Sequence, residues 1–173
     1  MARSYPLRDN TCVTTSGADV PAYLAGLRLR GRRVVVLGGG RVARRRLPAL
    51  VDAGAEVLVI APEVAPAVAR MAQRGVLQWA ERTYRPGDLV GAWYVLAATD
   101  VPEVNAQAAS EAEQQQTFCV RADDARHATA WTPATAEVDG VLVGVLAGRN
   151  PRRAAAVRDL LVDVLSRLGR RAA

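Results

Sequence analysis

The 173-residue chain contains no lysine, so all 23 of its basic residues are arginine. This absence excludes a Walker phosphate lysine, a Schiff-base lysine and a Tyr/Lys reductase pair. Histidine occurs once, at His127, and cysteine twice, at Cys12 and Cys119. We therefore expect no metal site and no disulfide framework, and a reducing cytoplasm is the expected location. A lone loop histidine such as His127 is interpreted as structural or solvated.

Long hydrophobic runs are missing too. No stretch of the sequence reaches the roughly 18 apolar residues that a bilayer span requires, and the N-terminus lacks the apolar core of a signal peptide. We therefore expect no membrane partner, and we interpret residues 1–20 as a flexible, polar leader. The length predicts a single domain, with or without a small appendage.

Acidic residues are too few to balance the arginines, and the net charge is +6. Guanidinium groups bind carboxylates and phosphates at two points, so the excess indicates an anionic partner. Nucleic acid is one alternative, but no nucleic-acid-binding motif accompanies the charge. A small polyanion is the favoured partner, and no nucleic acid is expected.

A glycine-rich turn is the most specific motif. The β-branched run from residue 34 to residue 37 breaks at Gly38, Gly39 and Gly40, and a helical pattern begins at once. In a dinucleotide-binding fold, Gly38 allows the turn, Gly40 allows close approach of a pyrophosphate, and Ala43 allows tight helix–strand packing. The helix N-terminus then offers N–H groups to the phosphates. A purely structural corner is the alternative.

Strand and helix patterns alternate after this turn. Strands are expected at Arg33–Leu37, Glu56–Ala61, Val76–Trp79, Ala92–Ala98 and Thr117–Arg121, and the intervening helices at Arg41–Ala53, Val64–Arg74 and Val101–Gln115. This order predicts an α/β fold, a Rossmann-like, doubly wound parallel sheet with helices on both faces.

A different pattern follows residue 122. Ala128–Trp131 and Val141–Leu146 are expected to form a β-hairpin with a turn at Asp139-Gly140. A last helix is expected from Arg152 to about Leu168, capped by Asn150 with Pro151 in its first turn. The predicted organisation is a leader (1–20), an NAD-binding domain (21–122), a hairpin (123–150) and a C-terminal helix (151–173).

Polar residues at the ends of the predicted parallel strands are the candidate ligand-binding residues, because ligands bind at that edge. Glu63 follows the second strand at about the distance expected for a ribose-binding acid. No arginine directly follows that strand, which favours NAD over NADP, although Arg41 in the loop leaves NADP open. A helix-start carboxylate is the alternative for Glu63.

The fourth and fifth strands also end in polar residues. Thr99 and Asp100 follow the fourth strand and are expected to face the glycine loop, although Asp100 could instead cap the next helix. Asp123 and Asp124 follow the fifth strand, where a carboxylate could exchange a proton beside a hydride-transfer site. A turn-forming Asp pair is the alternative.

Four segments, residues 21–43, 53–63, 91–105 and 118–124, resemble the precorrin-2 dehydrogenase family of the actinobacterial type, which is also the N-terminal module of siroheme synthase. The resemblance covers residues 21–160. It implies that NAD⁺ takes a hydride from precorrin-2, giving sirohydrochlorin on the way to sirohaem or cobalamin. It also implies that the hairpin is a dimerisation element, so a homodimer is expected.

The resemblance assigns residues as well. NAD would be held by the glycines together with Arg41, Val42, Pro62 and Glu63, and Asp123 would be the general base, which in bifunctional members also supports iron chelation. The substrate is a polycarboxylate tetrapyrrole, so arginines near the cleft would bind its carboxylates: Arg121, Arg126 and Arg149, with Arg152 or Arg153 as further candidates. Solvated loop charge is the alternative for these arginines.

The chain departs from the family pattern in three places, one of which is a short C-terminal helical region that ends at Ala173. Where the family usually has Asn-Val-Val-Asp, this chain has residues 120–123, with Arg121 two positions before Asp123. The Ser-rich, Gly-Gly turn before the last helix is reduced to residues 146–151. A non-catalytic NAD-binding sensor, or a degenerate paralogue, is therefore the alternative function.

Overall fold

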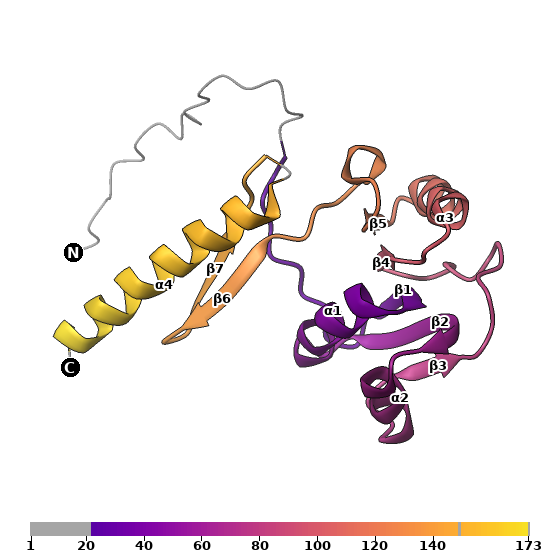
Figure 1. Ribbon diagram of the computed structural model, residues 1–173, viewed down its shortest axis with the longest axis horizontal. Helices are drawn as coiled ribbons and strands as arrows, with labels where there is room; N and C mark the ends of the chain where they lie inside the picture. Colours follow the sequence, from indigo (N-terminus) through magenta and orange to yellow (C-terminus); the bar gives the residue numbers. More distant parts are fainter. Residues whose placement is uncertain (1–21, 149, 173) are drawn as a thin grey trace, which may run out of the picture.

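The computed structural model describes residues 22–148 and 150–172, and its centre is a five-stranded parallel sheet (Figure 1). The strands run in the order β3-β2-β1-β4-β5. This order reverses beside β1, which is the switch point where open α/β sheets bind ligands. The predicted Rossmann-like fold is confirmed. The strands are β1 (Arg33–Gly39), β2 (Glu56–Val64), β3 (Gln78–Ala80), β4 (Tyr94–Ala97) and β5 (Phe118–Arg121).

Helices cover both faces of the sheet. Helices α1 (Arg41–Asp52) and α2 (Pro66–Gln73) lie on one face, and α3 (Pro102–Gln114) lies on the other (Figure 1). In β1, Val34 and Val36 pack on the α1 side while Val35 and Leu37 pack on the α3 side, and all four are fully buried. The continuous apolar run of β1 is thus explained by burial on two faces.

The C-terminal part forms an arm beside the sheet (Figure 1). Strands β6 (Ala134–Val138) and β7 (Val141–Val145) make an antiparallel hairpin, and α4 (Pro151–Ala172) packs along it. The predicted turn is confirmed, because Asp139 and Gly140 both have positive φ angles. The predicted cap is confirmed as well, since Asn150 Oδ1 accepts a hydrogen bond of 3.0 Å from the Arg153 N–H.

The first hairpin strand was expected at Ala128–Trp131, and this prediction is wrong. That segment lies along the open edge of β5 instead. Ala130 N–H donates to the Cys119 carbonyl at 3.1 Å, and the Thr129 hydroxyl accepts from the Cys119 N–H at 2.8 Å. Because a side-chain oxygen replaces a backbone carbonyl here, no regular ladder forms, and the hairpin strand begins only at Ala134.

The end of the second strand differs from prediction as well. It continues to Val64, past the expected end at Ala61, and α2 begins at Pro66. Smaller differences from the predicted ends occur in other elements. Helix α4, for example, ends at Ala172 and not near Leu168. The predicted leader at residues 1–20 lies outside the described residues. Among the residues that are described, no helix combines the length and apolar character needed to cross a membrane.

Candidate functional site

The glycine loop joins β1 to α1, and its three glycines have different surroundings. Gly38 has a φ of +94°, and a Cβ there would collide with the Ala98 backbone. A Cβ on Gly39 would overlap the Val64 side chain and lie 2.7 Å from the Glu63 carbonyl oxygen. A Cβ on Gly40 would meet nothing within 4 Å. The first two glycines thus allow close backbone packing, and the third leaves open space for a ligand.

The start of α1 opens onto that space. Gly40 is the N-cap residue, and within the described part of the chain no side chain caps the helix and no acid lies in its first turn. The first N–H groups of the helix, at Arg41 and Val42, therefore have no helical acceptor and no competing carboxylate. An anion such as a pyrophosphate fits this helix N-terminus.

Glu63 lies beside the glycine loop. The β1–β2 register shifts after Leu37, so that Gly39 pairs with Val64, and Ala65 N–H donates to the Gly39 carbonyl at 2.8 Å. The strand therefore does not close at residues 62–63 as expected, and both Pro62 and Glu63 are exposed within it. Glu63 is also not a helix-start residue. Its position next to the loop suits an acceptor for ribose hydroxyls.

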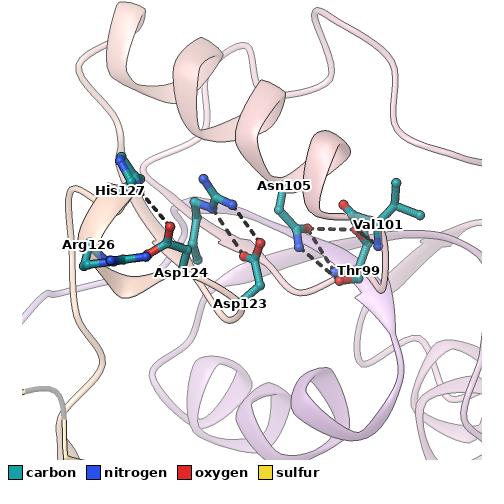
Figure 2. A network of polar contacts seen from close by, with 8 residues as sticks. Thr99, Val101, Asn105, Asp123, Asp124, Arg126 and His127 are labelled. Atoms are coloured by element: carbon teal, nitrogen blue, oxygen red, sulfur yellow. Dashed lines mark hydrogen bonds and ion pairs between the residues drawn. The ribbon is translucent and has the colours of Figure 1, made fainter.

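Thr99 is held by a buried asparagine (Figure 2). Asn105 is fully buried on α3, and its Oδ1 accepts from the Thr99 N–H at 3.1 Å and from the Thr99 hydroxyl at 2.8 Å. Its Nδ2 donates to the Thr99 carbonyl at 3.0 Å. The N-cap of α3 is Val101, so the alternative cap role of Asp100 is wrong. Asn105 was not predicted from the sequence.

Asp123 follows β5 at the same edge and is paired with Arg121. The guanidinium binds both carboxylate oxygens, with Nη2 at 2.7 Å from Oδ2 and Nε at 3.3 Å from Oδ1. The Arg121 side chain is only 9 % exposed, whereas that of Asp123 is 25 % exposed. This hydrogen-bonded cation lowers the pKa of Asp123 below its ordinary value, and the Asn105 amide adds to the effect.

Asp124 forms a separate cluster (Figure 2). Its carboxylate accepts from His127 Nδ1 at 2.7 Å and from the Arg126 backbone N–H at 3.1 Å. These two bonds, the histidine contact above all, lower the pKa of Asp124. The Arg126 side chain is 70 % exposed and pairs with Asp124 rather than Asp123. The two aspartates therefore have different partners, and His127, whose side chain is 70 % exposed, contacts Asp124.

A cleft of about 530 Å³ lies between α1, the end of β5, the hairpin and the start of α4. Its lining brings Val42 together with Asp123. Of the described residues, four arginines line it: Arg45, Arg46, Arg121 and Arg158. Asp123 is the only acidic side chain in that described lining. Arg126, Arg152 and Arg153 do not line the cleft, and Arg149 lies outside the described residues.

The sequence analysis missed Arg45, Arg46 and Arg158. The first two follow Val42 by three and four residues on α1, so they share its helix face, and this spacing was a usable signal. Burial lowers the pKa of Arg46, with a further contribution from the neighbouring charge of Arg45. A half-buried cation such as Arg46 beside the exposed Arg45 favours an anionic ligand. No cluster of described residues has the His, Cys, Asp or Glu set of a metal site.

Comparisons with known proteins agree with this geometry. Residues 25–134 match the family described as "Putative NAD(P)-binding". The chain is 36% identical over 139 residues to "Siroheme synthase 3" of Aeromonas hydrophila, covering 80% of this chain and 30% of that protein. It is 32% identical over 126 residues to "Precorrin-2 dehydrogenase" of Bacillus subtilis, covering 72% of this chain and 76% of that protein.

A solved structure has the same fold. "SirC, precorrin-2 dehydrogenase" superposes with a TM-score of 0.72 at 23% identity, covering 82% of this chain and 70% of that one. The chain spans 30% of the length of the siroheme synthases that it matches, and most of the length of the dehydrogenase. The chain therefore belongs to the family of NAD(P)-binding domains that includes precorrin-2 dehydrogenase and the siroheme synthases.

Proposed function

We propose that this chain catalyses the NAD-dependent dehydrogenation of precorrin-2 to sirohydrochlorin, with Asp123 as the general base. The cleft carries the proposal, because one carboxylate and four arginines, of the described residues, meet beside the glycine loop. Precorrin-2 is a tetrapyrrole with several carboxylates, and guanidinium groups are suited to bind them. The relatives named precorrin-2 dehydrogenase and siroheme synthase support the same substrate.

The residues at the sheet edge fit NAD. The α1 N-terminus at Arg41 and Val42 would hold the pyrophosphate over Gly40, and Glu63 would accept from a ribose hydroxyl. Thr99, fixed by Asn105, would border the cofactor. The bound cofactor supplies the acceptor for the hydride.

Asp123 has the complementary task of accepting a proton. The oxidation removes two electrons and one proton from a carbon centre as hydride, and a second proton must leave the substrate. Asp123, whose pKa lies below its ordinary value, is ionised at neutral pH, and the ionised carboxylate is the form that can accept the proton and release it to solvent. Arg45, Arg46 and Arg158 would bind the substrate carboxylates during this step.

We also propose that the active form is a homodimer. Helix α4 packs along the hairpin and carries an exposed apolar stripe of Val157, Leu160, Leu161, Val164 and Leu168. The hairpin adds Leu142, which is 69 % exposed. Exposed apolar side chains gathered along one stripe of a helix are typical of a protein interface. The cytoplasmic location remains a prediction from the sequence.

Anaerobic NADH formation tests the activity, with precorrin-2 generated in situ and NAD⁺ supplied. We expect turnover by the wild type and a loss of about 10²–10⁴-fold in kcat in Asp123→Asn, with NAD binding by calorimetry unchanged. Asp163→Asn, on the exposed surface of α4, is the matched control and should keep the wild-type rate. NAD binding without turnover would instead establish the non-catalytic sensor.

A further inference from the structure

Arg121 ends β5, and its guanidinium binds the proposed catalytic base. It is the last residue of β5, in register with Ala97 of β4, so it is fixed at the sheet edge that opens into the cleft. Both of its contacts with Asp123 are within hydrogen-bonding distance, at 2.7 Å and 3.3 Å. A fork of this geometry occupies both oxygens of the carboxylate at once.

This pairing has a cost for base catalysis. A carboxylate that accepts two hydrogen bonds from a cation has a lower affinity for protons than a free one. Asp123 as seen here is therefore ionised but poorly able to take a proton from a substrate. Release of the Arg121 guanidinium would restore the basicity of Asp123. Another anion must then pair with the guanidinium, because a nearly buried charge is stable only when it is paired.

The cleft offers that exchange. Its described lining holds Arg45, Arg46 and Arg158 besides Arg121, and Asp123 is the only acid in that lining, although Arg158 also pairs with Asp159 at 2.6 Å. A substrate with several carboxylates would bring more anions than the other three arginines can bind at two points each. A substrate carboxylate could therefore compete with Asp123 for the Arg121 fork.

We propose that Arg121 is a positioning residue that exchanges partners, pairing with Asp123 in the free protein and with a carboxylate of the bound substrate during the reaction. Substrate binding thereby releases Asp123 from its ion pair with Arg121, and this ion pair is kept as long as the cleft is empty. This inference rests on the proposed dehydrogenase function.

The charged and titratable groups around Asp123 are few. Arg121 and Cys119 belong to β5, the Asn105 amide comes from α3, and Asp124 is the neighbouring residue. The cleft side adds Arg45 and Arg46 from α1 and Arg158 from α4. Burial raises the pKa of the Cys119 thiol to about 11, so this group stays neutral over the pH range of the test.

The exchange predicts two different pH profiles. The acid limb of kcat/KM reports the base in the free enzyme, and that of kcat reports it in the substrate complex. Because the pKa of Asp123 is lowered only while Arg121 is paired with it, the acid limb of kcat should lie at higher pH than that of kcat/KM. In Arg121→Met, with no guanidinium in either state, the two limbs should coincide at the higher pH.

The experiment measures both profiles for the wild type, Arg121→Met and Arg121→Lys. We expect KM for precorrin-2 to rise about tenfold or more in Arg121→Met, and Arg121→Lys to give an intermediate value. Arg82→Met is the matched control. Arg82 also donates hydrogen bonds to both carboxylate oxygens of an aspartate, with 2.7 Å to each oxygen of Asp88, but this pair lies away from the cleft. It should leave KM and both limbs unchanged. Thermal melting confirms that each variant is folded.

A second measurement does not depend on turnover. The carboxyl carbon of Asp123 is titrated by NMR with and without sirohydrochlorin, and its pKa should rise on binding in the wild type but not in Arg121→Met. Wild-type turnover with an unchanged KM and superimposable limbs in Arg121→Met would overturn the exchange while leaving the proposed function intact. If the wild type shows no turnover, the proposed function fails, and the titration alone decides the exchange: no shift on ligand binding, or no binding, rejects it.

Discussion

Asn105 illustrates how one buried side chain shapes the site. Its amide satisfies the N–H, the hydroxyl and the carbonyl of Thr99, so a loop that borders the proposed cofactor is tied to the core of α3. A polar group that is fully buried must be hydrogen-bonded, because leaving its partners unpaired costs free energy. The buried Asn105 amide thus fixes the position of the loop at Thr99 through hydrogen bonds.

Replacing this residue should be costly. We expect Asn105→Ala to lower the free energy of unfolding by about 1–3 kcal/mol, because the Thr99 groups lose their buried partner. Urea denaturation measures the change. Gln107→Ala, at an exposed position of the same helix, should change it by less than about 0.5 kcal/mol. A loss in Asn105→Ala as small as that in Gln107→Ala would contradict the stabilising role of the Thr99 network.

The residues of the site were predictable from the sequence to different degrees. The glycine loop and Asp123 stand directly after recognisable strands, so their placement at one sheet edge followed from parallel topology. Arg158 could not be placed, because its approach to the cleft depends on how the C-terminal arm packs against the sheet. Arg126 was expected in the cleft, but a local bond to Asp124 turns it away.

At the scale of elements, the loop between β1 and α1 separates two roles of glycine. Gly39 is needed by the fold, since a Cβ there would overlap Val64 and the end of β2. Gly40 is an extended N-cap residue with open space around its Cα, so the protein alone does not require glycine there. The two positions thus provide a matched pair for mutation.

We expect Gly39→Ala to destabilise the protein by about 1–3 kcal/mol, because the extra methyl must push β2 away. Gly40→Ala should cost less than about 1 kcal/mol, yet weaken NAD binding by tenfold or more, because its methyl group occupies the space proposed for the pyrophosphate. Denaturant unfolding and calorimetric titration with NAD⁺ measure the two effects. Unchanged NAD affinity in Gly40→Ala would argue against the proposed phosphate position.

Elements with strong local patterns were predicted correctly, and those set by tertiary contacts were not. The five parallel strands and three covering helices follow from apolar runs and helical spacing. The segment around Thr129 has a strand-like composition, but its side-chain bond to β5 prevents a regular ladder. The extension of β2 to Val64 depends on pairing with Gly39 across the loop, which local pattern does not reveal.

For the whole molecule, several ion pairs make the free energy of unfolding depend on pH in the acid range. The pKa of Asp88 is lowered from 3.8, chiefly by its hydrogen bonds with Arg82, and those of Asp123 and Asp124 are lowered by their own partners. A carboxyl with a lower pKa in the folded state binds fewer protons there than in the unfolded chain. It therefore stabilises the fold above its unfolded pKa, and this contribution is lost as the pH falls through the folded value.

We expect the free energy of unfolding to decrease as the pH drops below about 4, the unfolded range of aspartate. Asp88→Asn should lower stability at neutral pH and reduce the slope of this decrease, because one of the contributing carboxyls is gone. Urea unfolding at a series of pH values measures the slope. Glu113→Gln, at an exposed position of α3, serves as the control. A slope in Asp88→Asn equal to that of the wild type would contradict the assignment.

The C-terminal arm gives the last prediction. Leu160 and Leu168 are 66 % and 55 % exposed in the apolar stripe of α4 that we propose as the dimer interface. We expect light scattering after size exclusion to give a dimer for the wild type and a monomer for Leu160→Glu combined with Leu168→Glu, because two carboxylates would be buried in the interface. Asp163→Lys, at an exposed position of the helix outside the stripe, should remain dimeric. A wild-type monomer, or a dimer that survives both glutamates, would show that this stripe is not the interface.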